Sequence, residues 1–86
     1  MNKKIIFHNF LKHCSNKGLL LLRDDIKFIE NGLNKVPYKL VHPTLKHYVF
    51  QWNAGMKEET DALKKQSSGR RKANQWFLGY VNGQHR

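Results

Sequence analysis

The chain of 86 residues has one cysteine, two prolines and only six acidic residues, and long apolar runs are missing. Its single thiol, Cys14, cannot form an internal disulfide, so a disulfide-stapled secreted scaffold is excluded. The longest aliphatic run, Leu19–Leu22, is far shorter than the roughly 18–20 residues that span a bilayer. We reject a signal peptide after Lys3 because His8 and Asn9 interrupt the apolar segment and no cleavage site follows. A reducing, cytoplasmic location is therefore expected.

The shortage of acids leaves a large positive charge. Lys and Arg number 16, and the formal net charge is +10. Solubility of a small domain needs a net charge of only about 2–8 in magnitude. The surplus positive charges repel one another in the folded state. A polyanionic partner is therefore the simplest explanation for them. At 40% hydrophobic residues the chain can fold, and its length predicts one small basic helical domain over residues 1–86.

Apolar residues recur at helical spacing, which predicts an all-α fold, a compact bundle of four or five short helices. We expect a first helix over residues 3–17, stopped by Gly18, and a second over about 23–31, stopped at Asn31-Gly32. Residues 19–22 form either a short buried strand or the start of the second helix, and a short hairpin over 19–23 is an alternative. A short helix is expected from Pro37 to His42, with Pro43 opening the next helix.

The clearest stripe predicts a long helix of about six turns from Thr44, which either kinks at Gly55 or ends near it. A turn with a serine N-cap is expected at residues 66–69, followed by a last helix. Both tryptophans lie on apolar stripes and are expected in the core. The long stripe comprises Leu45, Tyr48, Val49, Trp52, Met56, Thr60 and Leu63, and the last comprises Ala73, Trp76, Phe77, Tyr80 and Val81.

The run Arg70-Arg71-Lys72 is predicted to lie in the first turn of the last helix. Cations are unfavourable at that position because a helix N-terminus is already partly positive. Free backbone amides, Ser68 and the three cations would together bind phosphate. Asn74 and Gln75 could then reach bases or sugars. The alternative is a solvated helix start with tolerable repulsion.

A second basic patch surrounds the two prolines and comprises Lys39, Lys46 and His47. Tyr38 beside it either stacks on a base or packs in the core, and we favour packing. Phe50 lies off the main apolar stripe. We expect it to form a second packing surface, with an exposed stacking platform as the alternative.

The sequence contains no clear motif for catalysis or metal binding. The histidines lack the spacing of zinc ligands, so neither a metal nor another cofactor is expected. Cys14 lies on an apolar helix face, where thiols are usually inert. No phosphate-binding glycine loop or nucleophile elbow is present, so we do not expect an enzyme.

The segment Gly18-Leu19-Leu20-Leu21-Leu22-Arg23-Asp24-Asp25-Ile26 is similar to part of ProQ/FinO RNA-binding domains. The segment Leu45-Lys46-His47-Tyr48-Val49-Phe50-Gln51-Trp52 resembles the basic helix of that family. The resemblance covers residues 14–57. The glycine-alanine-x-arginine stretch and the hairpin that follow this helix in the family are missing. The resemblance implies binding to structured RNA, with Lys46 and Tyr48 on the binding helix.

These patterns predict a non-enzymatic nucleic-acid-binding protein that contacts phosphates through a basic face, with RNA favoured over DNA. A homodimer would supply two such faces. The alternative is a small interaction or inhibitor module, of mobile-element or phage type, that docks on an acidic protein surface. Attachment to an anionic membrane surface is a third interpretation. The predicted nucleic-acid contacts are Arg70, Arg71, Lys72, Ser68, Gln75, Lys39, Lys46 and His47.

Overall fold

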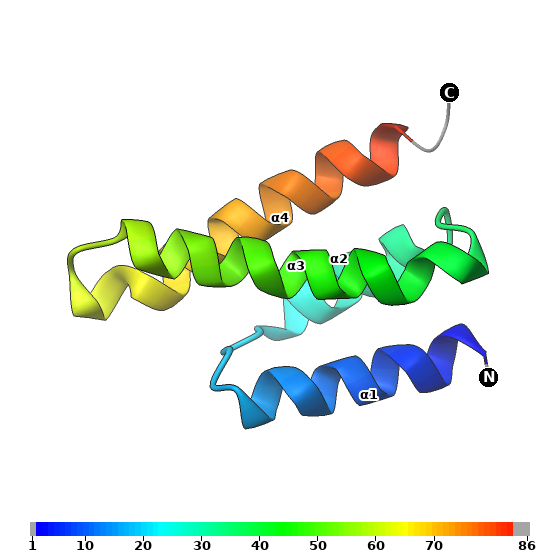
Figure 1. The fold of residues 1–86 in the computed structure, drawn as a ribbon, viewed down its shortest axis with the longest axis horizontal. Coiled ribbons are helices and arrows are strands. Elements are labelled where there is room, and N and C mark those ends of the chain that lie inside the picture. Colours follow the sequence, from blue (N-terminus) through cyan, green and yellow to red (C-terminus); the bar gives the residue numbers. More distant parts are fainter. Residues whose placement is uncertain (1, 84–86) are drawn as a thin grey trace.

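The computed structural model describes residues 2–83, which form four α-helices and one 3₁₀-helix (Figure 1). The predicted all-α bundle is confirmed. Residues 2–83 contain no strand, and the segment considered for a strand or hairpin is an irregular linker. In this linker the Leu20 N–H donates to the side chain of Gln66 at 3.1 Å. The elements are α1 (Lys3–Asn16), α2 (Arg23–Leu33), α3 (Tyr38–Glu58), η1 (Ala62–Lys64) and α4 (Lys65–Gly83).

Helix α3 runs along the long axis of the molecule, and the other helices pack around it (Figure 1). Helix α1 lies beside it and runs in the same direction, α4 returns antiparallel on the other side, and α2 lies behind. The core contains most of the residues that the apolar stripes predicted. Its fully buried large side chains are Trp52, Tyr48, Phe77, Ile29, Val36, Val41 and Cys14.

Helices α3 and α4 cross at two glycines, Gly55 and Gly69. A Cβ added to Gly55 would lie 2.8 Å from the Gly69 Cα and 2.7 Å from the Ser68 carbonyl oxygen. A Cβ on Gly69 would lie 2.7 Å from the Trp52 backbone oxygen and from Cδ1 of its ring. The backbones therefore approach so closely that only glycine fits at the crossing. Gly55 is a packing residue, and α3 ends three residues after it, at Glu58, which agrees with the predicted helix end near Gly55.

Helix α3 begins earlier than predicted and ends before the predicted apolar stripe does. Pro43 lies inside it rather than at a boundary between two helices. The missing N–H of Pro43 deprives only the Lys39 carbonyl of a partner, and both residues are exposed to water, so the helix continues. Leu63 is 95% exposed and does not extend the apolar stripe.

The end of α3 is determined by a residue that follows it in the chain. The Lys65 ammonium donates to the carbonyl oxygens of Met56 at 2.9 Å and Glu59 at 2.8 Å. The ammonium thus adds a second donor to the Met56 carbonyl, which already accepts from the Glu59 N–H at 3.3 Å, and gives the Glu59 carbonyl a partner just past the helix end. Asp61 then caps η1 by accepting from the Leu63 N–H at 2.9 Å. The predicted turn at residues 66–69 is wrong, because the reversal occurs at 59–61 and α4 already begins at Lys65.

Helices α1 and α2 agree better with prediction. Gly18 ends α1 in a left-handed conformation with φ of 77°. Helix α2 continues two residues past Asn31 because Gly32 lies against the Phe77 ring, where it is a contact point instead of a stop. The Phe28 ring packs edge-on against Phe77, with centroids 5.5 Å apart.

The glycine crossing predicts opposite effects for alanine at different glycines. Gly55→Ala and Gly69→Ala should each lower the free energy of unfolding by about 1–3 kcal/mol, because the added Cβ overpacks the crossing. Gly79→Ala is the matched control. Its Cβ meets nothing within 4 Å, so it should raise stability by about 0.5–1 kcal/mol. Urea denaturation measures all three, and equal stability of Gly55→Ala and wild type would contradict the crossing.

Candidate nucleic-acid interface

One exposed stripe of α3 carries positive charge and no acid. Its residues recur every three or four positions, so they lie on one side of the helix. All of them are exposed. We call this stripe the α3 face; it comprises Lys39, Pro43, Lys46, Phe50, Asn53 and Lys57. The predicted contacts Lys39 and Lys46 both belong to it.

An aromatic row borders the α3 face on the α4 side. Phe50 is 63% exposed, so the prediction that it packs is wrong. Its ring stacks on the His47 ring at a centroid distance of 5.4 Å. The centroid of the His47 ring in turn lies 4.5 Å from that of the Trp76 ring. Trp76 stacks in turn on Tyr80 at 5.2 Å, with 19° between the planes. Cations and accessible aromatic rings therefore occur side by side on this surface.

Two other aromatic residues also differ from prediction. Trp76 is half-buried, in contrast to Trp52, which is fully buried as predicted. Tyr38 is 50% exposed at the start of α3, so the packing alternative is wrong for it.

The cluster Arg70-Arg71-Lys72 does not lie at a helix start. Because α4 begins at Lys65, the amides near Ser68 are inside the helix and are not free to bind an anion. Lys72 forms an ion pair with Glu58 at 2.8 Å, and Arg70 lies 3.8 Å from the Asp25 carboxylate. These are the two ion pairs found within residues 2–83.

The polar residues of this cluster also have partners within the protein. Ser68 donates to the Glu59 carboxylate at 2.7 Å, and this bond lowers the pKa of Glu59. Arg71 and Gln75 remain exposed, one turn apart on the side of α4 that faces away from α3. The eight predicted contacts therefore divide between two separate surfaces, with Lys39, Lys46 and His47 together on one of them.

A buried polar network joins α2, α3 and α4. Tyr48 donates to the Asn74 side-chain oxygen at 2.6 Å, and Asn74 donates to the Asp25 carboxylate at 2.9 Å. Asp25 also accepts from the Leu22 N–H at 2.9 Å, which caps α2. Burial raises the pKa of the Tyr48 hydroxyl, and the negative charge of Asp25 raises it further. Tyr48 and Asn74 are thus structural, and neither offers its polar group to a ligand.

No cluster of three or more metal-ligating His, Cys, Asp or Glu side chains occurs in the described part of the chain. No helix within residues 2–83 is both long and apolar enough to cross a membrane. Cys14 is buried at 1% exposure, as its place on an apolar stripe predicts. Burial raises the pKa of its thiol to about 12, so the thiolate needed for nucleophilic chemistry is disfavoured.

Comparison with known proteins adds no assignment: no family model, no curated protein and no solved structure matches the chain. The resemblance of residues 14–57 to ProQ/FinO domains therefore stays a prediction. Tyr48, which that resemblance places on the binding helix, is fully buried, whereas Lys46 on the same helix is exposed.

The buried thiol predicts a specific loss of stability at alkaline pH. A pKa raised on folding stabilises the protein fully below the unfolded-state value, here near 9.0, and this stabilisation is lost as the pH rises toward 12. Between about pH 8 and 10 the free energy of unfolding should fall by about 1 kcal/mol more in wild type than in Cys14→Ala. The pKa of Tyr48 is raised far above this pH range, so the folded state keeps its hydroxyl protonated in both proteins and its contribution cancels there. Urea titrations at each pH measure the difference, and parallel curves would contradict it.

Proposed function

We propose that this protein is a non-enzymatic RNA-binding module whose α3 face contacts the phosphate backbone. The observation that carries the proposal is Phe50, a large aromatic ring left 63% exposed between Lys46 and Lys57 on a stripe without acids. Lysines supply affinity by neutralising phosphates and releasing their counterions. An exposed ring supplies a platform on which an unstacked base can lie.

RNA is favoured over duplex DNA because of the aromatic surface. Duplex DNA keeps its bases stacked inside the helix and offers mainly phosphates to an outer aromatic ring. Loops and single strands of RNA expose their bases for stacking on aromatic side chains. The row of Phe50, His47 and Trp76 provides ring faces and edges beside the lysines. We therefore assign the phosphate contacts to Lys39, Lys46 and Lys57, and the base contact to Phe50.

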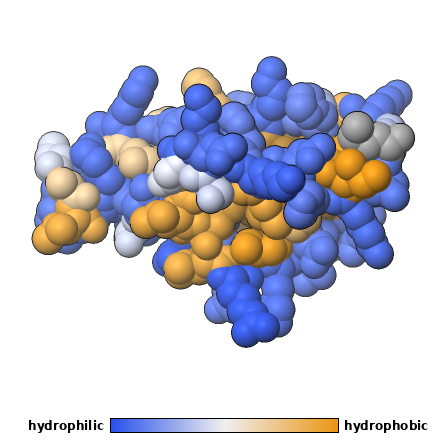
Figure 2. Space-filling view, turned by 90° about the horizontal axis from the view of Figure 1, so that it is seen from below, coloured by the Kyte–Doolittle hydropathy of each residue, from blue (hydrophilic) through white to orange (hydrophobic). Residues whose placement is uncertain are grey.

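A second candidate function is docking on an acidic protein surface. The linker between α1 and α2 exposes Leu20 at 62% and Leu22 at 52%. On the face seen from the α1 side, apolar surface gathers near the middle and hydrophilic side chains surround it (Figure 2). Leu78 is also exposed, whereas Leu40 is half-buried. Apolar patches framed by polar residues are typical of protein interaction sites.

A salt series decides between the two functions. Binding to a labelled RNA hairpin, an RNA single strand and a DNA duplex should weaken steeply with salt, with the RNA ligands bound more tightly. Weak binding to all three near physiological salt would overturn the RNA proposal and favour the protein partner. Sedimentation at the same concentrations tests the predicted homodimer.

Substitutions on the α3 face test the assignment. Phe50→Ala should reduce the free energy of RNA binding by about 1–3 kcal/mol through lost stacking. The double variant Lys39→Ala/Lys46→Ala should lower the salt slope by about 2, one phosphate contact for each lysine. Neither should change the melting temperature, because these side chains are exposed.

Each control variant removes the same kind of side chain from a site outside the α3 face. Leu63→Ala removes an exposed apolar side chain from η1, and Lys12→Ala/Lys17→Ala removes two exposed charges from the end of α1. Equal losses from the face variants and their controls would mean that net charge alone drives binding. Arg71→Ala tests the remaining exposed cation of the α4 cluster.

A further inference from the structure

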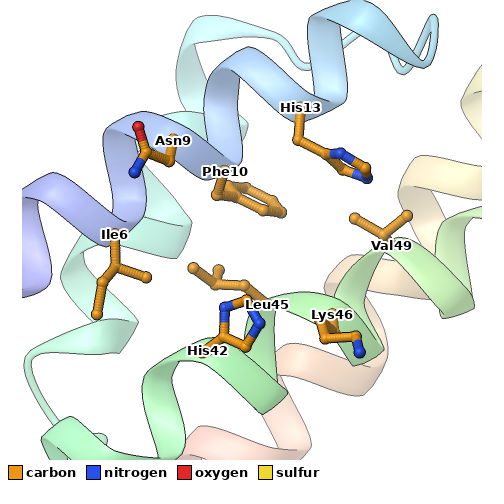
Figure 3. A pocket seen from close by; sticks show the side chains of 8 residues that line it. All are labelled: Ile6, Asn9, Phe10, His13, His42, Leu45, Lys46 and Val49. Atoms are coloured by element: carbon orange, nitrogen blue, oxygen red, sulfur yellow. The ribbon is translucent and has the colours of Figure 1, made fainter.

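A groove of about 510 Å³ lies between α1 and α3, next to the α3 face. Figure 3 shows Phe10 on α1 and Leu45 and Val49 on α3 directed into the space between the two helices. His13 borders it on the α1 side, and His42 and Lys46 border it on the α3 side. The groove therefore has an apolar floor and a polar, basic rim.

Helix α1 is anchored in the core by Phe7, Phe10 and Cys14 and is also hydrogen-bonded at both ends. Near its start, the Lys3 ammonium donates to the Leu33 carbonyl oxygen at 2.9 Å. Just beyond its end, the Gly18 carbonyl oxygen accepts from the Gln66 side chain at 3.0 Å. Between these points Phe10 packs edge-on against Tyr48, and the outer sides of the two helices remain apart. The space is thus held open by contacts with α2 and α4.

The lining of the groove suits a flat ring with polar edges. Pockets of about 300–1,000 Å³ with apolar walls and a few polar groups typically hold small organic ligands. The half-buried side chains of Ile6 and Val49 offer apolar surface for the faces of a ring, over a floor of the buried Phe10 and Leu45. Asn9 at the rim offers both an amide donor and a carbonyl acceptor, which a base edge needs.

Lys46 connects the groove to the α3 face, because it lines the one and belongs to the other. A phosphate held by Lys46 would therefore sit at the mouth of the groove. The groove spans residues 42–49 of α3, about 10 Å at 1.5 Å per residue, which is the length of one or two nucleotides. We propose that the groove binds an unpaired nucleotide of the RNA, with its base between α1 and α3 and its phosphate at Lys46. This inference rests on the proposed RNA-binding function and names the part of the RNA that is recognised.

Filling the groove tests the proposal. Val49 is half-buried and lines the groove, so Val49→Trp should block it, whereas Val49→Ala leaves it open. The two ligands are a blunt, fully paired RNA duplex and the same duplex with one bulged nucleotide. Wild type and Val49→Ala should bind the bulged RNA at least about tenfold more tightly than the paired one. Val49→Trp should lose this preference and keep its affinity for the paired duplex.

A second variant does not require the core to tolerate a larger side chain. Asn9 is exposed on α1, and Asn9→Ala should weaken binding of the bulged RNA alone. Its control is Asn16→Ala, an exposed asparagine at the end of the same helix. In amide NMR spectra, adenosine 5′-monophosphate should shift the signals of Asn9 and His13, and inorganic phosphate should not.

The outcomes separate this inference from the function on which it rests. If no RNA binds near physiological salt, both are overturned. If both RNAs bind but Val49→Trp and Asn9→Ala keep the preference for the bulge, the groove is not the nucleotide site and the α3-face proposal stands. If an acidic amphipathic peptide shifts Asn9 and His13 while adenosine 5′-monophosphate does not, the groove binds a protein segment and the inference is overturned.

Discussion

The close approach of α3 and α4 at Gly55 and Gly69 determines how the rest of the molecule is arranged. With no side chain on either glycine, the Trp52 ring lies directly against the α4 backbone. Its indole N–H can then reach the Gln66 side-chain oxygen at 3.2 Å. Gln66 also accepts from the Leu20 N–H and donates to the Gly18 carbonyl, so it fixes the linker that follows α1. The crossing thereby positions three helices through one glutamine.

The arrangement also decides which surfaces stay open. Helix α4 covers the side of α3 that carries Tyr48 and Trp52. Its own stripe of Gly69, Ala73 and Phe77 is buried in this contact. Helix α1 lies on the other side of α3, and the stripe between α1 and α4 has no helix over it, so Lys46 and Phe50 face outward. Between them, the aromatic row and the α1–α3 groove border the exposed stripe on its two sides. The longest helix is thus covered by α1 and α4 but not along this stripe, which presents a wide basic surface with apolar recesses.

The helices could be predicted from the sequence because apolar residues repeat with the period of a helix along most of the chain. The end of α3 and the start of α4 could not, because side chains outside each helix determine them. Lys65 caps α3, and no local pattern marks a lysine as the partner of carbonyls six and nine residues earlier. Ser68 resembles an N-cap in sequence, yet its hydroxyl binds Glu59 from inside a helix.

The predicted contact residues on α3 share one exposed surface, whereas those on α4 mostly have partners within the protein. This difference also depends on residues that are distant in sequence. Lys39, Lys46 and His47 lie on one helix, so their spacing already indicates a common side. Arg70 and Lys72 instead form ion pairs with Asp25 and Glu58. These partners are distant in sequence, so only the folded structure shows the pairs. The exposure of Phe50 likewise depends on which helix covers α3. The amphipathic period shows that Phe50 is off the main stripe, but it does not show whether a second helix packs there.

The two tryptophans divide between the interior and the surface, and this gives the protein separate optical reporters. Trp52 is fully enclosed beside Gln66, so its emission should be blue-shifted and should change only when the fold opens. Trp76 is half-buried in the aromatic row, next to His47. A base that arrives at that row would quench the adjacent indole. Emission at long wavelength would thus follow events at the surface while emission at short wavelength follows the integrity of the core.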